Sequence, residues 1–239
     1  MLGEKSLKGY TFLRKARILD NPQKKKGSFN WKKNFFKAVN EHRTINLDIG
    51  NLCTLECPKC ARQGRYKDTR PVPGHNMTVD EFDKISNFFT QIHLCGQISD
   101  PIFNPNLFDF IKMSNQKDKF LQIHSAASQK PIKWYEEAFA EHGRGGWTFG
   151  IDGLPKDSHK YRIHQDGEKL FTVAQMAVRA GLKVRWQYIV FKYNENDIDE
   201  AVSMARDNGI EFELNSSSRW DGPHDPYRPT KSEYRIDRW

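Results

Sequence analysis

The chain has 239 residues, of which 37% are hydrophobic and 13% aromatic, a composition that supports a folded core and excludes a wholly disordered protein. No apolar run approaches the ~20 residues that span a bilayer, and the N-terminus lacks the apolar stretch of a secretory signal. We therefore expect a soluble, cytoplasmic protein without membrane contact. The net charge of +8 is uneven, because residues 1–43 carry twelve Lys or Arg against three acids. This stretch could contact nucleic acid or another anionic partner, or could be a solvated surface.

Short apolar segments alternate with amphipathic ones from Thr44 onward, which predicts βα units around a parallel sheet. Thr78 and Glu81 form a capping box at the start of the first predicted helix, and Gly181 and Gly209 close the last two. The predicted strands cover residues 44–50, 92–95, 120–124, 147–151, 184–191 and 210–214. The predicted helices begin near residue 78 and then cover 106–113, 131–142, 168–180 and 197–208.

The composition changes after Leu214 to Ser, Pro, Arg and Asp without periodicity. We expect three parts: a basic N-terminal extension over 1–43, a core over 44–214 and a short irregular C-terminal tail over 215–239. The tail would lie on the core or wait for a partner. Active sites of parallel βα folds form at the carboxyl ends of the strands, and three of the four cysteines follow the first predicted strand.

Cys53, Cys57 and Cys60 form a C-x3-C-x2-C run. Three thiolates on one tight loop can each hold one corner iron of a [4Fe-4S] cluster and leave the fourth iron open, as a catalytic centre requires. The alternative is a zinc site in which Cys57 and Cys60 are joined by Cys53 and a histidine such as His75. In that case the chain would be a non-catalytic module that binds nucleic acid through its basic N-terminal segment.

The cysteine run resembles the signature of the radical S-adenosylmethionine (SAM) enzymes, and the resemblance covers roughly residues 44–214. It implies an α/β fold, a partial (β/α)6 barrel, with a [4Fe-4S] cluster on the three cysteines and SAM as the second cofactor. Members of the family cleave SAM reductively to a 5′-deoxyadenosyl radical, which takes a hydrogen atom from the substrate. The resemblance also implies an electron donor such as flavodoxin or ferredoxin. The substrate stays open between a peptide and a nucleic acid or nucleotide, and no catalytic residue is assigned.

One downstream segment resembles the family in part, and a second lacks the motif that the family often has there. The stretch after the second strand, with Gly96, Gln97, Ser99 and Asp100, resembles a glycine-rich loop that contacts the methionine part of the cofactor, although Ser99 stands where a second glycine is common. Ser125 stands where the family often has Thr-Asn-Gly. It could bond cofactor hydroxyls or be an ordinary loop serine.

A third segment, Ile151-Asp152-Gly153, resembles the family's strand-Asp-Gly motif and is followed by Arg162. The resemblance implies that Asp152 accepts hydrogen bonds from the ribose and that Arg162 pairs with the cofactor carboxylate. Each could instead serve a local turn or ion pair. Gln187 lies on a strand that lines the adenine and substrate cavity in related members.

Two residues depart from the family or stand outside its motif. Lys59 occupies a position where an aromatic usually packs near adenine, and Cys95 is expected to be a small buried residue. No cysteine follows Leu214, so we expect a small member of the family without an auxiliary-cluster domain.

Overall fold

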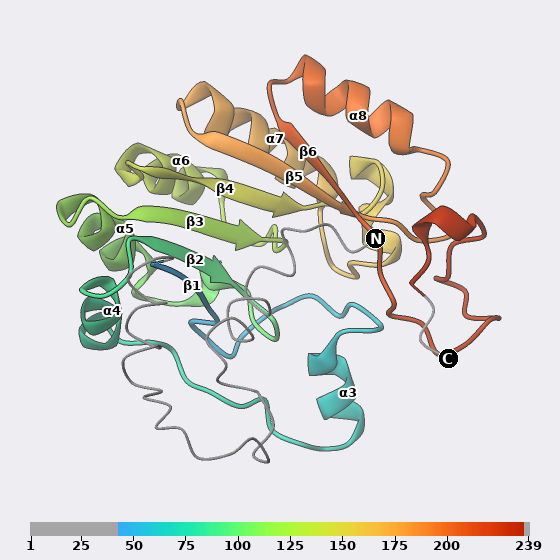
Figure 1. Cartoon of the computed structure of the whole chain (residues 1–239), viewed down its shortest axis with the longest axis horizontal. Coiled ribbons are helices and arrows are strands. Elements are labelled where there is room, and N and C mark those ends of the chain that lie inside the picture. The colour runs from blue at the N-terminus through green and yellow to red at the C-terminus, as the bar shows by residue number, and fades with distance from the viewer. Residues whose placement is uncertain (1–42, 237–239) are drawn as a thin grey trace, which may run out of the picture.

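The computed structural model describes residues 43–236, so residues 1–42 of the predicted basic extension lie outside the described part. Six parallel strands form one sheet in the order of the sequence, and each strand is hydrogen-bonded to the next. This confirms the predicted α/β class and the open partial (β/α)6 barrel (Figure 1). The strands are β1 (Thr44–Leu47), β2 (Gln91–Cys95), β3 (Phe120–Ser125), β4 (Gly145–Gly150), β5 (Lys183–Ile189) and β6 (Glu211–Asn215).

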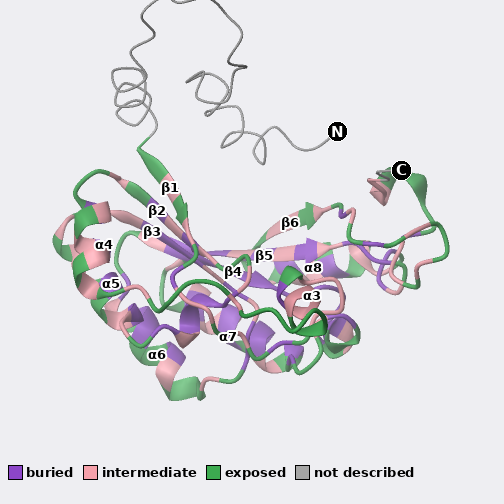
Figure 2. Ribbon diagram, turned by 90° about the horizontal axis from the view of Figure 1, so that it is seen from below, coloured by how far each residue is buried: buried purple, intermediate pink, exposed green. Residues whose placement is uncertain are grey.

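The helices that connect the strands lie mainly along one face of the sheet (Figure 2). The predicted capping box is present, since Thr78 caps its helix and Glu81 bonds back to the Thr78 backbone. The α-helices are α3 (Ala61–Lys67), α4 (Val79–Ser86), α5 (Leu107–Gln116), α6 (Ile132–Glu141), α7 (Gly167–Arg179) and α8 (Ile198–Asp207). Three short 3-10 helices complete the described elements: η1 (Pro101–Phe103), η2 (Pro155–Lys160) and η3 (Ser232–Tyr234).

Several local predictions differ from the structure. The helix α3, which directly follows Cys60, was not predicted, because its sequence ARQGRYK has no apolar stripe. Pro131 is the N-cap of α6 and does not lie in its first turn. The strand β1 ends at Leu47 and not at residue 50, and the Asp48 carboxylate that follows it accepts hydrogen bonds from the loop after β2.

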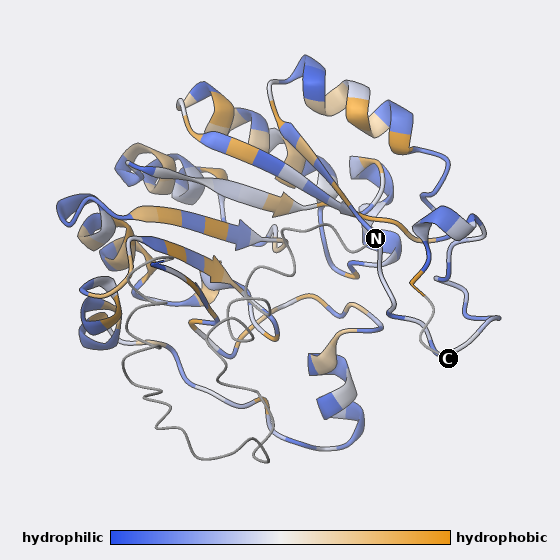
Figure 3. Cartoon of the chain, in the orientation of Figure 1, coloured by the Kyte–Doolittle hydropathy of each residue, from blue (hydrophilic) through white to orange (hydrophobic). Residues whose placement is uncertain are grey.

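The two faces of the sheet have opposite chemistry, and hydropathy alternates along several strands (Figure 3). The face toward the helices is apolar and fully buried, and Trp147, Phe149 and Trp186 are among its largest side chains. Burial of each such side chain contributes roughly 1.5–3 kcal/mol. The opposite face carries a row that the strand register places side by side: Cys95, His124, Thr148, Arg185 and Glu211.

Polar residues on that inner face distinguish this open sheet from a closed (β/α)8 barrel, whose interior is filled by branched apolar side chains. The inner face is therefore not packed as an apolar core. None of the helices among residues 43–236 is long and apolar enough to cross a membrane.

The residues after β6, which we call the C-terminal segment (residues 216–236), fold back onto the domain. The Lys192 amide donates to the carbonyl of Tyr227 at 3.1 Å, and the Glu195 carboxylate accepts from the amide of Thr230 at 2.7 Å. Apart from the 3-10 helix η3, the segment is irregular, and of the two placements considered from the sequence it takes the one on the core.

Candidate functional site

A cavity of about 330 Å³ opens where the strands end. Ten of the eleven site residues predicted from the sequence line it, although they come from five separate parts of the chain. Asp152 is the exception. The ten are Cys53, Cys57, Cys60, Gly96, Gln97, Ser99, Asp100, Ser125, Arg162 and Gln187.

The cysteine loop runs from the end of β1 to the start of α3. The Cys60 amide donates to the Cys57 carbonyl at 3.0 Å, and Cys60 is also the N-cap of α3, which keeps the loop tight. Burial raises the pKa of the Cys53 thiol to about 12. Burial also raises the pKa of Cys57, to about 11, although the nearby Arg162 charge opposes the rise.

The donor chemistry of this loop fits an iron–sulfur cluster. Cys53, Cys57 and Cys60 are free thiols in one cavity, and thiolates are the usual ligands of such clusters. His75, which completed the alternative zinc site, does not line this cavity and bonds Glu81 at 3.0 Å. Within residues 43–236 no three His, Cys, Asp or Glu side chains are grouped closely enough to hold one metal ion.

The loop after β2 approaches the cavity with its backbone. A Cβ added at Gly96 would lie 1.7 Å from the Ser99 carbonyl oxygen, so only glycine fits there. The Asp48 carboxylate orders the loop, because it accepts from the amides of Gln97 at 2.9 Å and Ile98 at 3.1 Å. Asp48 was missed because the strand was predicted over residues 44–50, which placed Asp48 inside it, whereas β1 ends at Leu47.

Asp100 and Arg62 join the loops that surround the cavity. The buried Asp100 carboxylate accepts from the amides of Ala126 at 2.8 Å and Ala127 at 3.0 Å, which links the loops after β2 and β3. Burial raises its pKa, and these hydrogen bonds oppose the rise. Arg62, which the sequence analysis did not single out, donates to the carbonyls of residues 51 and 98 at 2.5 and 3.0 Å.

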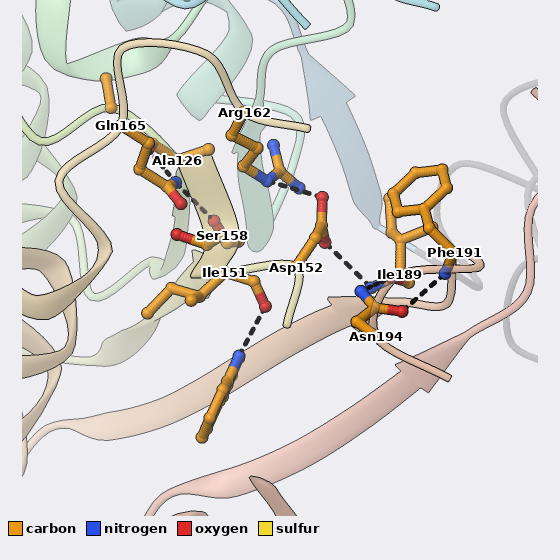
Figure 4. A network of polar contacts seen from close by, with 12 residues as sticks. Ala126, Ile151, Asp152, Ser158, Arg162, Gln165, Ile189, Phe191 and Asn194 are labelled. Atoms are coloured by element: carbon orange, nitrogen blue, oxygen red, sulfur yellow. Dashed lines mark hydrogen bonds and ion pairs between the residues drawn. The ribbon is translucent and has the colours of Figure 1, made fainter. Parts of the chain in front are cut away.

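Asp152 is fully buried and does not line the cavity; Figure 4 shows its contacts with Arg162 and Ile189. One carboxylate oxygen pairs with Nε of Arg162 at 2.8 Å, and the other accepts from the Ile189 amide at 2.9 Å. Burial raises the pKa of Asp152, and the Arg162 charge opposes this effect. Both carboxylate oxygens therefore have partners. Asp152 does not line the cavity itself but is paired with Arg162, which does.

The sheet contributes an uncharged polar wall made by Gln187, His124 and Thr148. Burial lowers the pKa of His124 to about 4, with a further contribution from His93, whose ring centre lies 5.9 Å away. His124 is therefore neutral at pH 7. Successive side chains of a strand point to opposite faces, so an apolar Ile123 on the helix side places His124 on the inner face. This was the signal that could have identified it.

The C-terminal segment forms the remaining wall, with Ser216, Ser217 and Arg219 lining the cavity. The segment is connected to the cysteine loop by Lys59, whose ammonium lies 2.5 Å from Asp221. Lys59, which stands where the family usually has an aromatic residue, thus forms an ion pair here. The sequence analysis did not place any of these contacts.

No family model and no curated protein matches the chain in sequence. Solved structures do match. SuiB from Streptococcus suis, bound to S-adenosylmethionine, has a TM-score of 0.63 at 14% identity, over 94% of this chain and 54% of that chain. Another SuiB structure, bound to the precursor peptide SuiA, has a TM-score of 0.60 at 14% identity, over 88% of this chain and 51% of that chain.

Two further structures match this chain over a larger share of their own length than SuiB does. Methylornithine synthase (PylB) has a TM-score of 0.56 at 15% identity, over 97% of this chain and 72% of that chain. TYW1 with a bound lysine-pyruvate adduct has a TM-score of 0.55 at 12% identity, over 88% of this chain and 74% of that chain. These neighbours are radical SAM enzymes, and the chain spans about half the length of SuiB. The chain therefore shares the fold of these enzymes, which is the partial (β/α)6 barrel that the resemblance of the cysteine run implied.

Proposed function

We propose that this protein is a radical SAM enzyme. Its cysteine loop would hold a [4Fe-4S] cluster on Cys53, Cys57 and Cys60, and SAM would bind in the adjoining cavity. When bound, the two cofactors supply an electron and a 5′-deoxyadenosyl radical that abstracts hydrogen from the substrate. The observation that carries the proposal is that three thiols from one loop line the same cavity as polar residues of the loop after β2, of the end of β3 and of the segment after β4.

The other lining residues have roles that follow from their contacts. The loop after β2, whose tight turn only Gly96 allows, would contact the methionine part of SAM. Arg162 offers its guanidinium to the cofactor carboxylate. Since the Asp152 carboxylate is bonded to Arg162 and the Ile189 amide, we assign it to positioning Arg162 instead of binding the ribose. Ser125 and Gln187, which line the cavity, would bond the nucleoside.

The reaction partners are part of the same proposal. Reductive cleavage needs a one-electron donor, for which flavodoxin or ferredoxin is suited. The substrate is a peptide or a nucleic acid or nucleotide, and the SuiB structure with its precursor peptide SuiA supports the first of these. We propose an intracellular location, because oxidising compartments do not favour a cluster held by free thiols.

The proposal is tested by anaerobic reconstitution of the full chain with iron and sulfide. We expect brown protein with about four irons per chain and broad absorbance at about 400 nm. Alanine variants of Cys53, Cys57 or Cys60 should lose the cluster and the release of 5′-deoxyadenosine under reducing conditions.

Cys95→Ala is the matched control, because Cys95 lines the cavity but lies on β2, outside the cysteine loop. It should keep both iron and 5′-deoxyadenosine release. Colourless protein with one zinc per chain would support the nucleic-acid-binding module instead, and wild-type release from Cys57→Ala would refute the assigned ligands.

A further inference from the structure

The C-terminal segment is held against the cavity at two places. Far from the cysteines, the Glu195 carboxylate accepts from the amides of Thr230 and Lys231 at 2.7 and 3.1 Å. Near the cysteines, the polypeptide crosses back toward the loop after β1. These contacts bring residues that follow the last strand next to residues that follow the first, and so close one side of the cavity.

Lys59 makes the contact near the cysteines. It lies between Cys57 and Cys60, and its ammonium is 2.5 Å from Asp221 and 2.6 Å from Asp225. The Asp225 side chain is only 3% exposed and that of Lys59 is 19% exposed. Partial burial strengthens such an ion pair relative to a surface one. The position of the C-terminal segment is therefore tied to that of the cysteine loop.

Three arginines line the cavity, and two of them are already engaged. Arg62 donates to two backbone carbonyls, and Arg162 is paired with the buried Asp152. The Arg219 side chain has no hydrogen bond or ion pair to any residue between 43 and 236. Its backbone amide donates to the Ser217 hydroxyl at 3.1 Å, which orients the residue within the segment.

The surroundings of Arg219 favour an anionic ligand. Asp100 is the single acidic residue among the described residues that line the cavity, and its oxygens accept from backbone amides. The sheet wall is uncharged, since His124 is neutral at pH 7. The Arg219 charge interacts with the buried Asp152, whose carboxylate is already paired with Arg162. A guanidinium without a direct ion pair presents its fork of N–H donors to a carboxylate or a phosphate.

We propose that the substrate carries a carboxylate or phosphate group that Arg219 binds, and that the C-terminal segment is the wall that presents this arginine. Lys59 is the positioning residue of that wall. The inference rests on the proposed function and adds the substrate class to it. A cavity of about 330 Å³ lies at the small end of ligand pockets, so the cofactor fills its inner part and the substrate approaches along the segment.

The test is chemical modification of arginines by phenylglyoxal in the reconstituted full chain, saturated with S-adenosylhomocysteine and followed by peptide mass spectrometry. Inorganic phosphate and glutarate are the two anion probes, and they distinguish a phosphate from a carboxylate ligand. We expect at least one probe to slow the modification of Arg219 severalfold. The exposed Arg144, which pairs with Asp118 away from the cavity, is the internal control and should not change.

Two outcomes would overturn the proposal. If neither anion protects Arg219, the residue binds no anion. If S-adenosylhomocysteine alone protects it fully and anions add nothing, Arg219 belongs to the cofactor site. Iron content is measured on the same sample, so a failure of the proposed function is seen separately, and the anion arms can still be run without the cofactor analogue.

Variants test the positioning role and give an independent readout. Arg219→Gln should weaken anion affinity about 10- to 100-fold, the loss expected for a charged hydrogen bond. Lys59→Gln should weaken anion affinity and increase hydrogen exchange in the C-terminal segment, whereas Lys59→Arg should restore both. Lys160→Gln, which removes a surface pair with Asp157, is the matched control. Unchanged anion affinity in Lys59→Gln would refute the positioning role.

Discussion

The buried pair between Asp152 and Arg162 allows a quantitative test of how the site is held. The Asp152→Asn substitution keeps the shape of the side chain and an acceptor for the Ile189 amide, but it removes the charge opposite a guanidinium whose side chain is only 13% exposed. Breaking a buried pair from one side costs about 3–5 kcal/mol. The retained hydrogen bond places this variant at the lower end, about 3 kcal/mol. For a chain of this size, that lowers Tm by about 6–12 °C.

Glu211→Gln is the matched control, because it also removes a carboxylate from an arginine. Its pair with Arg185 spans 3.1 Å, and the side chains are 62% and 32% exposed. Such a pair contributes less than about 1 kcal/mol. Replacing both buried partners, as Asp152→Leu with Arg162→Met, should cost less than Asp152→Asn alone, since no buried charge stays unpaired.

The assay is urea unfolding of the cluster-free chain, followed by circular dichroism under reducing conditions. An Asp152→Asn variant within about 1 kcal/mol of the wild type would refute the reasoning, and so would a Glu211→Gln variant as unstable as Asp152→Asn.

The same pair gives a pH test. In Arg162→Met the Asp152 carboxyl loses the charge that opposed the burial effect, so its pKa in the folded state rises further above the ordinary 3.8. The folded state then binds a proton that the unfolded state has released. Stability must therefore fall as pH rises above the ordinary value. This variant should be closer to the wild type at pH 5 than at pH 8, and the opposite trend would contradict the assignment.

Two further predictions concern a loop and a buried ring. Gly96→Ala should destabilise the chain and abolish cluster binding, because its Cβ would lie 1.7 Å from a backbone oxygen. Gly64→Ala is the control: Gly64 lies in α3 with open space around it, so the substitution should be neutral or stabilising by up to about 1 kcal/mol. Thermal unfolding and iron content report both variants, and equal effects would contradict the steric argument. His142 accepts from the Trp147 ring N–H at 2.7 Å and bonds a backbone carbonyl at 3.0 Å, which together require a neutral ring. Burial lowers its pKa from 6.5 to about 4, so the unfolded state binds more protons and stability is lost as pH falls through this range. His142→Gln should show a shallower loss between pH 7 and pH 5 in urea unfolding, and an unchanged slope would assign the acid sensitivity to other groups.

Local sequence signals predicted most elements of the fold because the forces behind them act between near neighbours. Thr78 and Glu81 are three residues apart, and their reciprocal hydrogen bonds form as predicted. Gly181 and Gly209 have φ values of +81° and +67°, which glycine adopts readily, and each follows a helix end. The helix α3 escaped prediction, since its seven residues are fixed by the cysteine loop that precedes them and not by an apolar stripe.

The spacing of the cysteines alone determined that three thiols share one loop after a strand. The alternation of apolar and polar residues along the strands determined that the sheet has one apolar and one polar face. Tertiary contacts decided the rest of the site. Lys59 meets Asp221 across 162 positions of the chain, and Asp152 turns to Arg162 and the Ile189 amide instead of to the cavity. Periodicity shows which face a side chain takes, but the partner of a charge on that face depends on which distant segment the folded chain brings beside it.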